Sequence, residues 1–125
     1  MTDTPAPSAH DIASAFSGHR FADAYAGLSE HVRWVAFGVA TTIGRDAVID
    51  LCETTLRELA DTRTEYLRFL VVDGGEAVAV DSVARYVEGS GATTTVASCD
   101  IYEFHQGQVT TITSYTVLLE PEPDE

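Results

Sequence analysis

Alternation of hydrophobic and polar residues dominates the second half of the chain. Residues 65–72, 77–88 and 94–120 are rich in β-branched and aromatic side chains, and glycine-containing turns separate them. Such segments are typical of strands that bury one face. The last segment is interrupted by the turn-like sequence HQGQ at residues 105–108, so it predicts a hairpin of two long strands. The second half of the chain therefore predicts an antiparallel run of four strands.

The first half of the chain shows helical spacing instead. Ser8 followed by Asp11 is a capping signal for a helix that ends near Gly18. Apolar residues recur at helical spacing over residues 21–28, which predicts a short second helix, and over residues 46–60, which predicts a long third helix.

A strand over residues 31–37 separates the second and third predicted helices, and a turn-like segment follows it. Helices first and strands afterwards predict an α+β fold, in which the three helices pack on one face of a strongly curved antiparallel sheet. A chain of 125 residues suits one such domain. We place it at residues 8–119, between a disordered N-terminal tail (1–7) and an acidic, proline-broken tail (120–125).

Charge and composition narrow the functional classes. Twenty acidic residues against seven basic ones give a net charge of −13, which argues against binding to nucleic acid or to an anionic membrane. The apolar runs are far shorter than the about 20 residues of a membrane span, and no secretion signal is visible. We therefore expect a cytoplasmic protein in which Cys52 and Cys99 are free thiols. No metal-ligand spacing is visible, so we expect neither a metal nor a cofactor.

Asp100 stands out because it lies within an apolar strand. A buried carboxylate is costly unless it is hydrogen-bonded, paired or protonated. Strand alternation places four residues on the same face as Asp100: Val96, Ser98, Tyr102 and Phe104. One interpretation is a pocket carboxyl that shares a hydrogen bond with a ligand oxygen. The other is a structural aspartate satisfied by its neighbours Ser98 and Tyr102, by Arg85 or by water.

The histidines carry no comparable signal. None of His10, His19, His31 and His105 has an acid, cysteine or serine at a spacing typical of a catalytic group or ligand, and we assign them no functional role. Trp34, the only tryptophan, suits either the wall of an apolar pocket or an ordinary core position.

The order of these elements and two motifs resemble the nuclear transport factor 2-like superfamily, in particular its SnoaL-like and ketosteroid isomerase-like branch. The motifs are IGRD at residues 43–46, which opens the long helix, and D-x-x-x-F at residues 100–104 followed by GQV at 107–109 and Tyr115. The resemblance extends over residues 12–119. It implies a cone-shaped barrel with a hydrophobic pocket between the helices and the concave face of the sheet, and often a homodimer through the outer face.

The same resemblance implies which strand residues point into that pocket. On the last strand it turns Ile112, Ser114 and Thr116 inward, and on the strand before the hairpin it turns Asp81, Val83 and Arg85 inward. A shift of one residue in the register of this strand would turn Asp81, Val83 and Arg85 to the outer face. The candidate ligand-binding residues are thus Trp34, Val83, Ser98, Tyr102, Ile112, Ser114 and Thr116. The candidate catalytic residues are Asp100, Asp81 and Arg85.

The resemblance implies several activities, and the residues at the expected catalytic positions argue for or against each of them. In ketosteroid isomerase an Asp base acts with a Tyr and a protonated Asp that form an oxyanion hole. The base position falls on Val35 or Ala36 and the tyrosine position near Ile12, and an aliphatic side chain cannot transfer a proton. The carboxylate expected late in the last strand of SnoaL-type cyclases is also missing, since residues 115–117 read YTV.

We therefore expect a protein that binds a small, mostly apolar, steroid- or polyketide-like ligand, with Asp100 as the main polar contact. The first alternative is an isomerase, cyclase or epoxide-hydrolase-like enzyme that uses Asp100 with Asp81 or Arg85 in metal-free acid–base catalysis. The second alternative is a non-catalytic dimerisation module whose cavity is filled by its own side chains.

Overall fold

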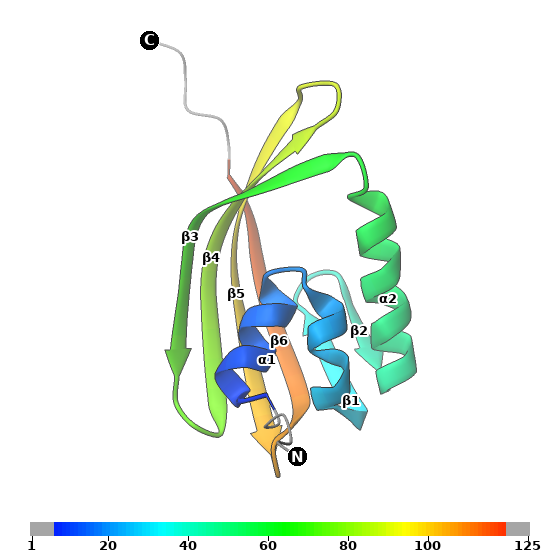
Figure 1. Cartoon of the computed structure of the whole chain (residues 1–125), viewed down its shortest axis with the longest axis vertical. Coiled ribbons are helices and arrows are strands. Elements are labelled where there is room, and N and C mark those ends of the chain that lie inside the picture. Colours follow the sequence, from blue (N-terminus) through cyan, green and yellow to red (C-terminus); the bar gives the residue numbers. More distant parts are fainter. Residues whose placement is uncertain (1–6, 120–125) are drawn as a thin grey trace, which may run out of the picture.

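The computed structural model of the chain describes residues 7–119. The predicted acidic tail and all but one residue of the predicted N-terminal tail lie outside this range. Over the described residues the fold is α+β, with two α-helices, two short 3₁₀ helices and six strands (Figure 1). Along the chain these are α1 (Ala9–Ser17), η1 (Phe21–Asp23), η2 (Tyr25–Gly27), β1 (Leu28–Ala36), β2 (Ala40–Ile43), α2 (Arg45–Glu58), β3 (Thr62–Asp73), β4 (Ala77–Glu88), β5 (Thr93–His105) and β6 (Gln108–Leu119).

The six strands form one curved sheet in the order β2-β1-β6-β5-β4-β3. Strands β3 to β6 are the predicted antiparallel meander, whereas β1 pairs with β6 in parallel. The register shifts between Tyr66 and Arg68 and again between Glu103 and Phe104, and such irregularities bend and twist long strands. Helix α1 packs against β3, β4 and β5, and α2 packs against β1 and β2, so the helices cover the concave face (Figure 1).

The first helix begins as its sequence predicts. Ser8 and Asp11 form a capping box, in which the Ser8 hydroxyl accepts a hydrogen bond from the Asp11 N–H at 3.1 Å. The apolar face of the helix buries Ile12 and Phe16. The Phe16 ring packs edge-on against three other rings, those of Phe21, Trp34 and Tyr102, at centroid distances of 5.0, 5.1 and 5.9 Å.

The prediction of a second helix over residues 21–28 is wrong. The segment forms the two 3₁₀ turns η1 and η2, and Leu28 already belongs to β1. Phe21 and Leu28 are buried in the structure, and their spacing is compatible with a helix as well as with 3₁₀ turns, so the apolar spacing did not distinguish the two. At Gly27 this segment approaches α1 closely, and a Cβ at that position would be 2.5 Å from Cδ1 of Ile12.

The turn predicted after the first strand contains a further short strand, β2, which pairs antiparallel with β1. At the other end, Gly44 precedes α2 with φ of 98°, a left-handed backbone conformation that suits glycine. None of the helices within residues 7–119 has the length and hydrophobicity needed to cross a membrane.

Candidate functional site

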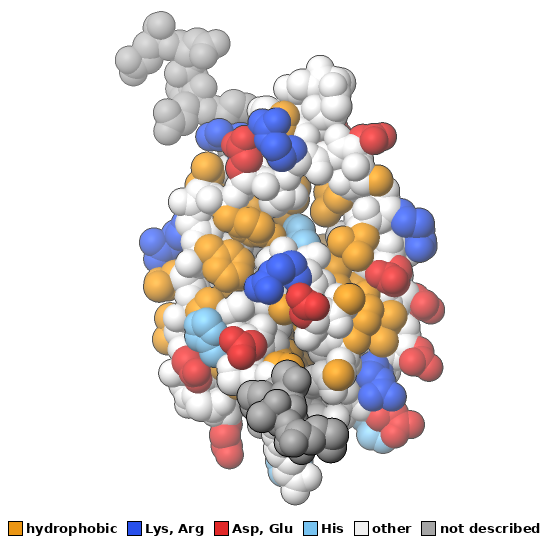
Figure 2. Space-filling view, in the orientation of Figure 1, with side chains coloured by type: hydrophobic (Ala, Val, Ile, Leu, Met, Phe, Trp, Pro, Cys, Tyr) orange, Lys and Arg blue, Asp and Glu red, His pale blue; other side chains and the backbone are white. Residues whose placement is uncertain are grey.

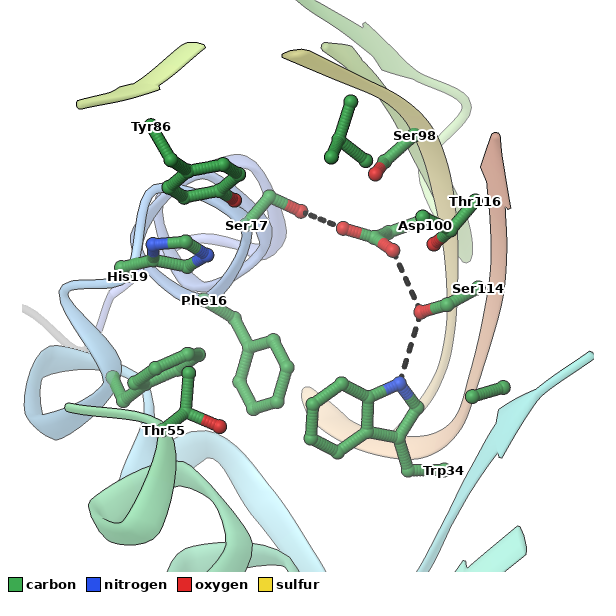
Figure 3. Close-up of a pocket in the computed structure, with 13 residues that line it drawn as sticks. Phe16, Ser17, His19, Trp34, Thr55, Tyr86, Ser98, Asp100, Ser114 and Thr116 are labelled. Atoms are coloured by element: carbon green, nitrogen blue, oxygen red, sulfur yellow. Dashed lines mark hydrogen bonds between the residues drawn. The ribbon is translucent and has the colours of Figure 1, made fainter. Parts of the chain in front are cut away.

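A cavity of about 240 Å³ lies between the end of α1, the last turn of α2 and the concave face of the sheet (Figure 3). Aromatic rings form much of its wall, from Phe16, Phe21, Trp34 and Tyr86. The polar groups come mainly from the inward faces of β5 and β6. The cavity is therefore an apolar chamber with a polar patch on the sheet.

The register of β5 and β6 arranges this patch. Asp100 lies directly opposite Ser114, and Ser98 lies directly opposite Thr116. Opposed residues of an antiparallel pair point to the same face with their Cβ atoms about 5 Å apart, so the four side chains form a compact group. Tyr115 and Val117 point to the outer face, where they are exposed. Ser98, Asp100, Ser114 and Thr116 all line the cavity.

Both oxygens of the Asp100 carboxyl accept hydrogen bonds from serine hydroxyls. The Ser17 hydroxyl, at the C-terminus of α1, donates to Oδ2 at 2.7 Å, and the Ser114 hydroxyl donates to Oδ1 at 2.6 Å. Figure 3 shows the carboxyl held between these two hydroxyls on the wall of the cavity. The partly buried carboxylate is thus fixed by two elements, α1 and β6, far apart in the chain.

A second layer of donors orients the two serines. The Trp34 indole N–H donates to the Ser114 oxygen at 2.9 Å. The hydroxyls of Ser17 and Tyr102 are 2.6 Å apart. Because each hydroxyl carries one proton, and that of Ser17 is directed at Asp100, Tyr102 is the donor in this pair. Complete burial and the charge of Asp100 raise the pKa of Tyr102, which keeps it an O–H donor.

His19 and Tyr86 form another part of the wall, opposite Asp100 in Figure 3. Their rings are stacked, with centroids 6.1 Å apart and planes 18° from parallel. His19 follows Gly18 with φ of 61°, so the chain turns sharply after α1 and directs the imidazole into the cavity. Burial lowers the pKa of His19, and the negative charge of Asp100 opposes this effect only partly. Within residues 7–119 the imidazole has no hydrogen-bond partner, so a neutral, unpaired imidazole faces the cavity.

Four of the seven predicted ligand-binding residues line the cavity: Trp34, Ser98, Ser114 and Thr116. Tyr102 and Ile112 lie on the same sheet face but are completely buried in the core beside the cavity, where only Tyr102 is linked to the polar group through Ser17. Val83 lies on the outer face, so its predicted pocket position is wrong. Ala36, one of the two positions considered for a catalytic base, does line the cavity, and its methyl group cannot transfer protons.

The predicted inward direction of Asp81 and Arg85 is also wrong. Strand β4 pairs Val80 with Asp100 and Asp81 with Cys99, which places Asp81 and Arg85 on the outer face. There Asp81 accepts a hydrogen bond from Arg68 Nε at 2.8 Å, and Arg85 pairs with Glu65 at 3.2 Å. The predicted register was one residue out of step, and an error of one residue exchanges the two faces of a strand.

Sequence reasoning missed several cavity residues, above all Ser17, His19 and Tyr86. Tyr86 could have been found by alternation once the register of β4 was known. Ser17 and His19 lie at the end of α1, 83 and 81 positions before Asp100, and nothing local relates them to it. Within the described part of the chain, no three histidine, cysteine or acidic side chains lie together in a way that could hold a metal ion.

The arrangement of helices on a curved six-stranded sheet is the nuclear transport factor 2-like fold, as comparison with solved structures shows. The model of the SnoaL-like domain family matches residues 9–112, and the chain belongs to this family. A search of curated proteins found no match for this chain.

Three solved structures illustrate the similarity. An NTF2-like protein of unknown function from Cytophaga hutchinsonii is 29% identical, with a TM-score of 0.74, covering 85% of this chain and 93% of that one. A candidate polyketide cyclase from Xanthomonas campestris pv. campestris is 20% identical, with a TM-score of 0.65 and coverage of 83% and 85%. A candidate isomerase from Rhodopseudomonas palustris is 16% identical, with a TM-score of 0.60 and coverage of 84% and 82%.

Proposed function

We propose that the protein binds a small, mostly apolar molecule in the cavity, with Asp100 as its main polar contact. The observation that carries this proposal is the Asp100 carboxyl, which two serine hydroxyls hold on the wall of a chamber whose wall is in large part aromatic. A carboxylate in such surroundings is costly unless its interactions compensate for lost hydration. Four side chains from three strands and one helix support it, which favours a functional over an incidental position.

The volume of the cavity limits the size of the ligand. Sites for drug-sized molecules measure about 300–1,000 Å³, and an apolar cavity of about 150 Å³ can hold benzene. At about 240 Å³ the present cavity suits a molecule with one or two rings. A steroid or a four-ring polyketide would extend beyond it. The existence of this chamber also favours a binding role over the dimerisation module with a filled cavity.

Acid–base catalysis is the second candidate function. Asp81 and Arg85 lie on the outer face, away from Asp100, but His19 lines the same cavity as a neutral base that has no hydrogen-bond partner within residues 7–119. A base on one wall and a fixed carboxylate on another could move a proton between two positions of one substrate, as an isomerase or a cyclase requires. The fold that the chain shares with the candidate cyclase and the candidate isomerase is compatible with such chemistry.

We also propose that the protein is a cytoplasmic homodimer. The outer face of the sheet supports this, because it exposes Tyr115, Val117 and Leu70, which are 46%, 59% and 46% accessible. Phe37 stacks on Tyr115 at 4.9 Å and extends the same apolar surface. A second copy would cover these side chains. The two cysteines are free in the structure, in keeping with a reducing compartment.

The test of ligand binding uses the single tryptophan. Because the Trp34 N–H is hydrogen-bonded to Ser114 at the cavity wall, its indole resonance in ¹H–¹⁵N spectra should shift when a molecule enters. We expect shifts with some one- and two-ring compounds, weakened by Asp100→Asn and unaffected by Asp81→Asn, the same change on the outer face. If no compound of this size moves the Trp34 resonance or raises the melting temperature, the proposal is wrong.

A further inference from the structure

We infer that the polar group this cavity selects is a hydrogen-bond donor, and that an ammonium group on a small aromatic or aliphatic body suits it best. This inference rests on the proposed ligand-binding function and names its ligand class. It differs from the carbonyl-containing ligand that an oxyanion hole would take. Three features carry it, namely the direction of the hydrogen bonds, the charge balance of the cavity and its aromatic wall.

The hydrogen bonds around Asp100 all run in one direction. Trp34 donates to Ser114 and Ser114 donates to Asp100, while Tyr102 donates to Ser17 and Ser17 donates to Asp100. The indole N–H is a donor only, which fixes the direction of the Trp34–Ser114 bond, and an ionised carboxylate can only accept, which fixes the direction of the Ser114–Asp100 bond. Asp100 therefore accepts hydrogen bonds on both oxygens and has no proton with which to donate a hydrogen bond to a carbonyl oxygen.

The carboxylate still has capacity for a ligand. Its two oxygens provide about four acceptor positions, and the two serines use one on each oxygen. Asp100 is partly exposed on the cavity wall, so positions remain open toward the chamber. A ligand that reaches them must bring its own N–H or O–H group. An N⁺–H donor adds the Coulomb attraction between two opposite charges to the hydrogen bond, which a neutral O–H lacks, and this favours N⁺–H over O–H.

The second feature is the charge balance of the cavity around Asp100. The residues that line it include no arginine or lysine in the part of the chain that the structure describes. Arg68 and Arg85, on the outer face, are paired with Asp81 and Glu65. His19 is the one cavity residue that could become positive, and burial lowers its pKa, which leaves it neutral near pH 7. The chamber thus carries one uncompensated negative charge.

The remaining walls suit a cation with an apolar body. Phe16, Phe21, Trp34 and Tyr86 present aromatic rings to the chamber, and ring faces attract ammonium groups, tryptophan most strongly. The net charge of −13 adds a long-range attraction for cations and repels anions. Figure 2 shows that many acidic side chains lie toward the edges of the face drawn, around hydrophobic side chains nearer its centre.

Four probes of nearly equal shape separate the alternatives: 2-phenylethylamine, 2-phenylethanol, 2-phenylethyl methyl ether and 3-phenylpropanoate. They carry a cationic donor, a neutral donor, an acceptor and an anion. Binding is followed by the Trp34 indole resonance at pH 7. We expect the amine to bind about tenfold or more tightly than the alcohol, and the ether and the propanoate to bind more weakly still.

Variants then assign the preference to one carboxyl. Asp100→Asn should weaken amine binding about tenfold or more and change alcohol binding by less, whereas Asp81→Asn should leave both unchanged. Raising the salt concentration should weaken binding of the amine more than that of the alcohol. The ranking of the four probes needs only the wild-type protein, so it stands even if the Asp100 variant does not fold.

The outcomes distinguish this inference from the proposed function. If probes move the Trp34 resonance but the ether or the propanoate binds as tightly as the amine, the cavity binds ligands and the inference is wrong. The same conclusion follows if Asp100→Asn folds and keeps the amine preference. If none of the four probes binds at any concentration, the proposed ligand-binding function is contradicted, and this inference with it.

Discussion

Ser114 lies directly across the β5–β6 pair from Asp100 and directs its hydroxyl proton to Oδ1 at 2.6 Å, while its own oxygen accepts the Trp34 indole N–H at 2.9 Å. One small side chain therefore connects the tryptophan of β1 with the carboxylate of β5. Ser114 is 7% accessible, so water has little access to replace the hydrogen bonds of its hydroxyl group. The roles of Ser114, Asp100 and His19 in the cavity, and that of the exposed outer face of the sheet, can each be tested by substitution.

Replacing Ser114 with alanine removes a donor and an acceptor at once. Trp34 loses its acceptor and one oxygen of Asp100 loses a donor, so we expect a loss of about 1–3 kcal/mol in the free energy of unfolding. Urea denaturation followed by tryptophan fluorescence measures it. Thr116→Val is the matched control, because Thr116 lines the same cavity, is exposed and should cost less than about 0.5 kcal/mol. Equal losses in the two variants would contradict the described network.

Asp100→Asn tests whether the carboxylate serves the ligand or the fold. The amide nitrogen replaces one of the two acceptor oxygens and faces a serine hydroxyl that can reorient, so we expect a stability loss below about 3 kcal/mol. Asp81→Asn, whose ion pair with Arg68 is on the surface, should change stability by less than about 1 kcal/mol. A stability loss well above about 3 kcal/mol in Asp100→Asn would assign Asp100 a mainly structural role.

His19 predicts a pH dependence of stability with a defined sign. Its pKa in the folded protein is lowered by burial, so the unfolded chain takes up a proton first as the pH falls. The contribution of His19 is complete above the unfolded value of about 6.5 and is lost as the pH falls below it toward the folded pKa. Urea midpoints at pH 7.5 and 5.5 should therefore differ, with the lower midpoint at pH 5.5.

His19→Asn is the variant for this test, since asparagine tolerates the φ of 61° at this position. The difference in midpoint between the two pH values should shrink in this variant. His105→Asn, which replaces an exposed histidine at the end of β5, provides the control. A full difference that persists in His19→Asn would assign the pH dependence to other groups.

Val117→Glu tests the proposed homodimer. Val117 points outward on β6 and is 59% accessible, so a second copy that covers this face would bury the new charge. Light scattering coupled to size exclusion should report the mass of a dimer for the wild type and that of a monomer for the variant. Leu51→Glu, an exposed apolar residue on α2 with 40% accessibility, should leave the mass unchanged. A monomeric wild type would exclude the dimer directly.

The extent of a strand and the direction of its faces depend on different properties of the chain. Strand β4 runs from Ala77 to Glu88 as predicted, because alternation and flanking turns are local properties of the chain. Its faces were predicted the wrong way round, because the register that aligns Val80 with Asp100 depends on pairing between strands. The apolar spacing over residues 21–28 predicts a helix where two 3₁₀ turns form, since the same spacing of buried residues is compatible with either structure.

The sequence by itself determined five of the six strands within residues 7–119, the first and last α-helices and the exceptional position of Asp100, since periodicity and the cost of a carboxylate among apolar residues can be read locally. Only the tertiary structure decided what surrounds that carboxylate. Ser17 and His19 are remote from Asp100 along the chain and reach its cavity because α1 lies across the concave face of the sheet. Contacts of this kind depend on how elements pack against one another, and no local pattern of residues encodes that packing.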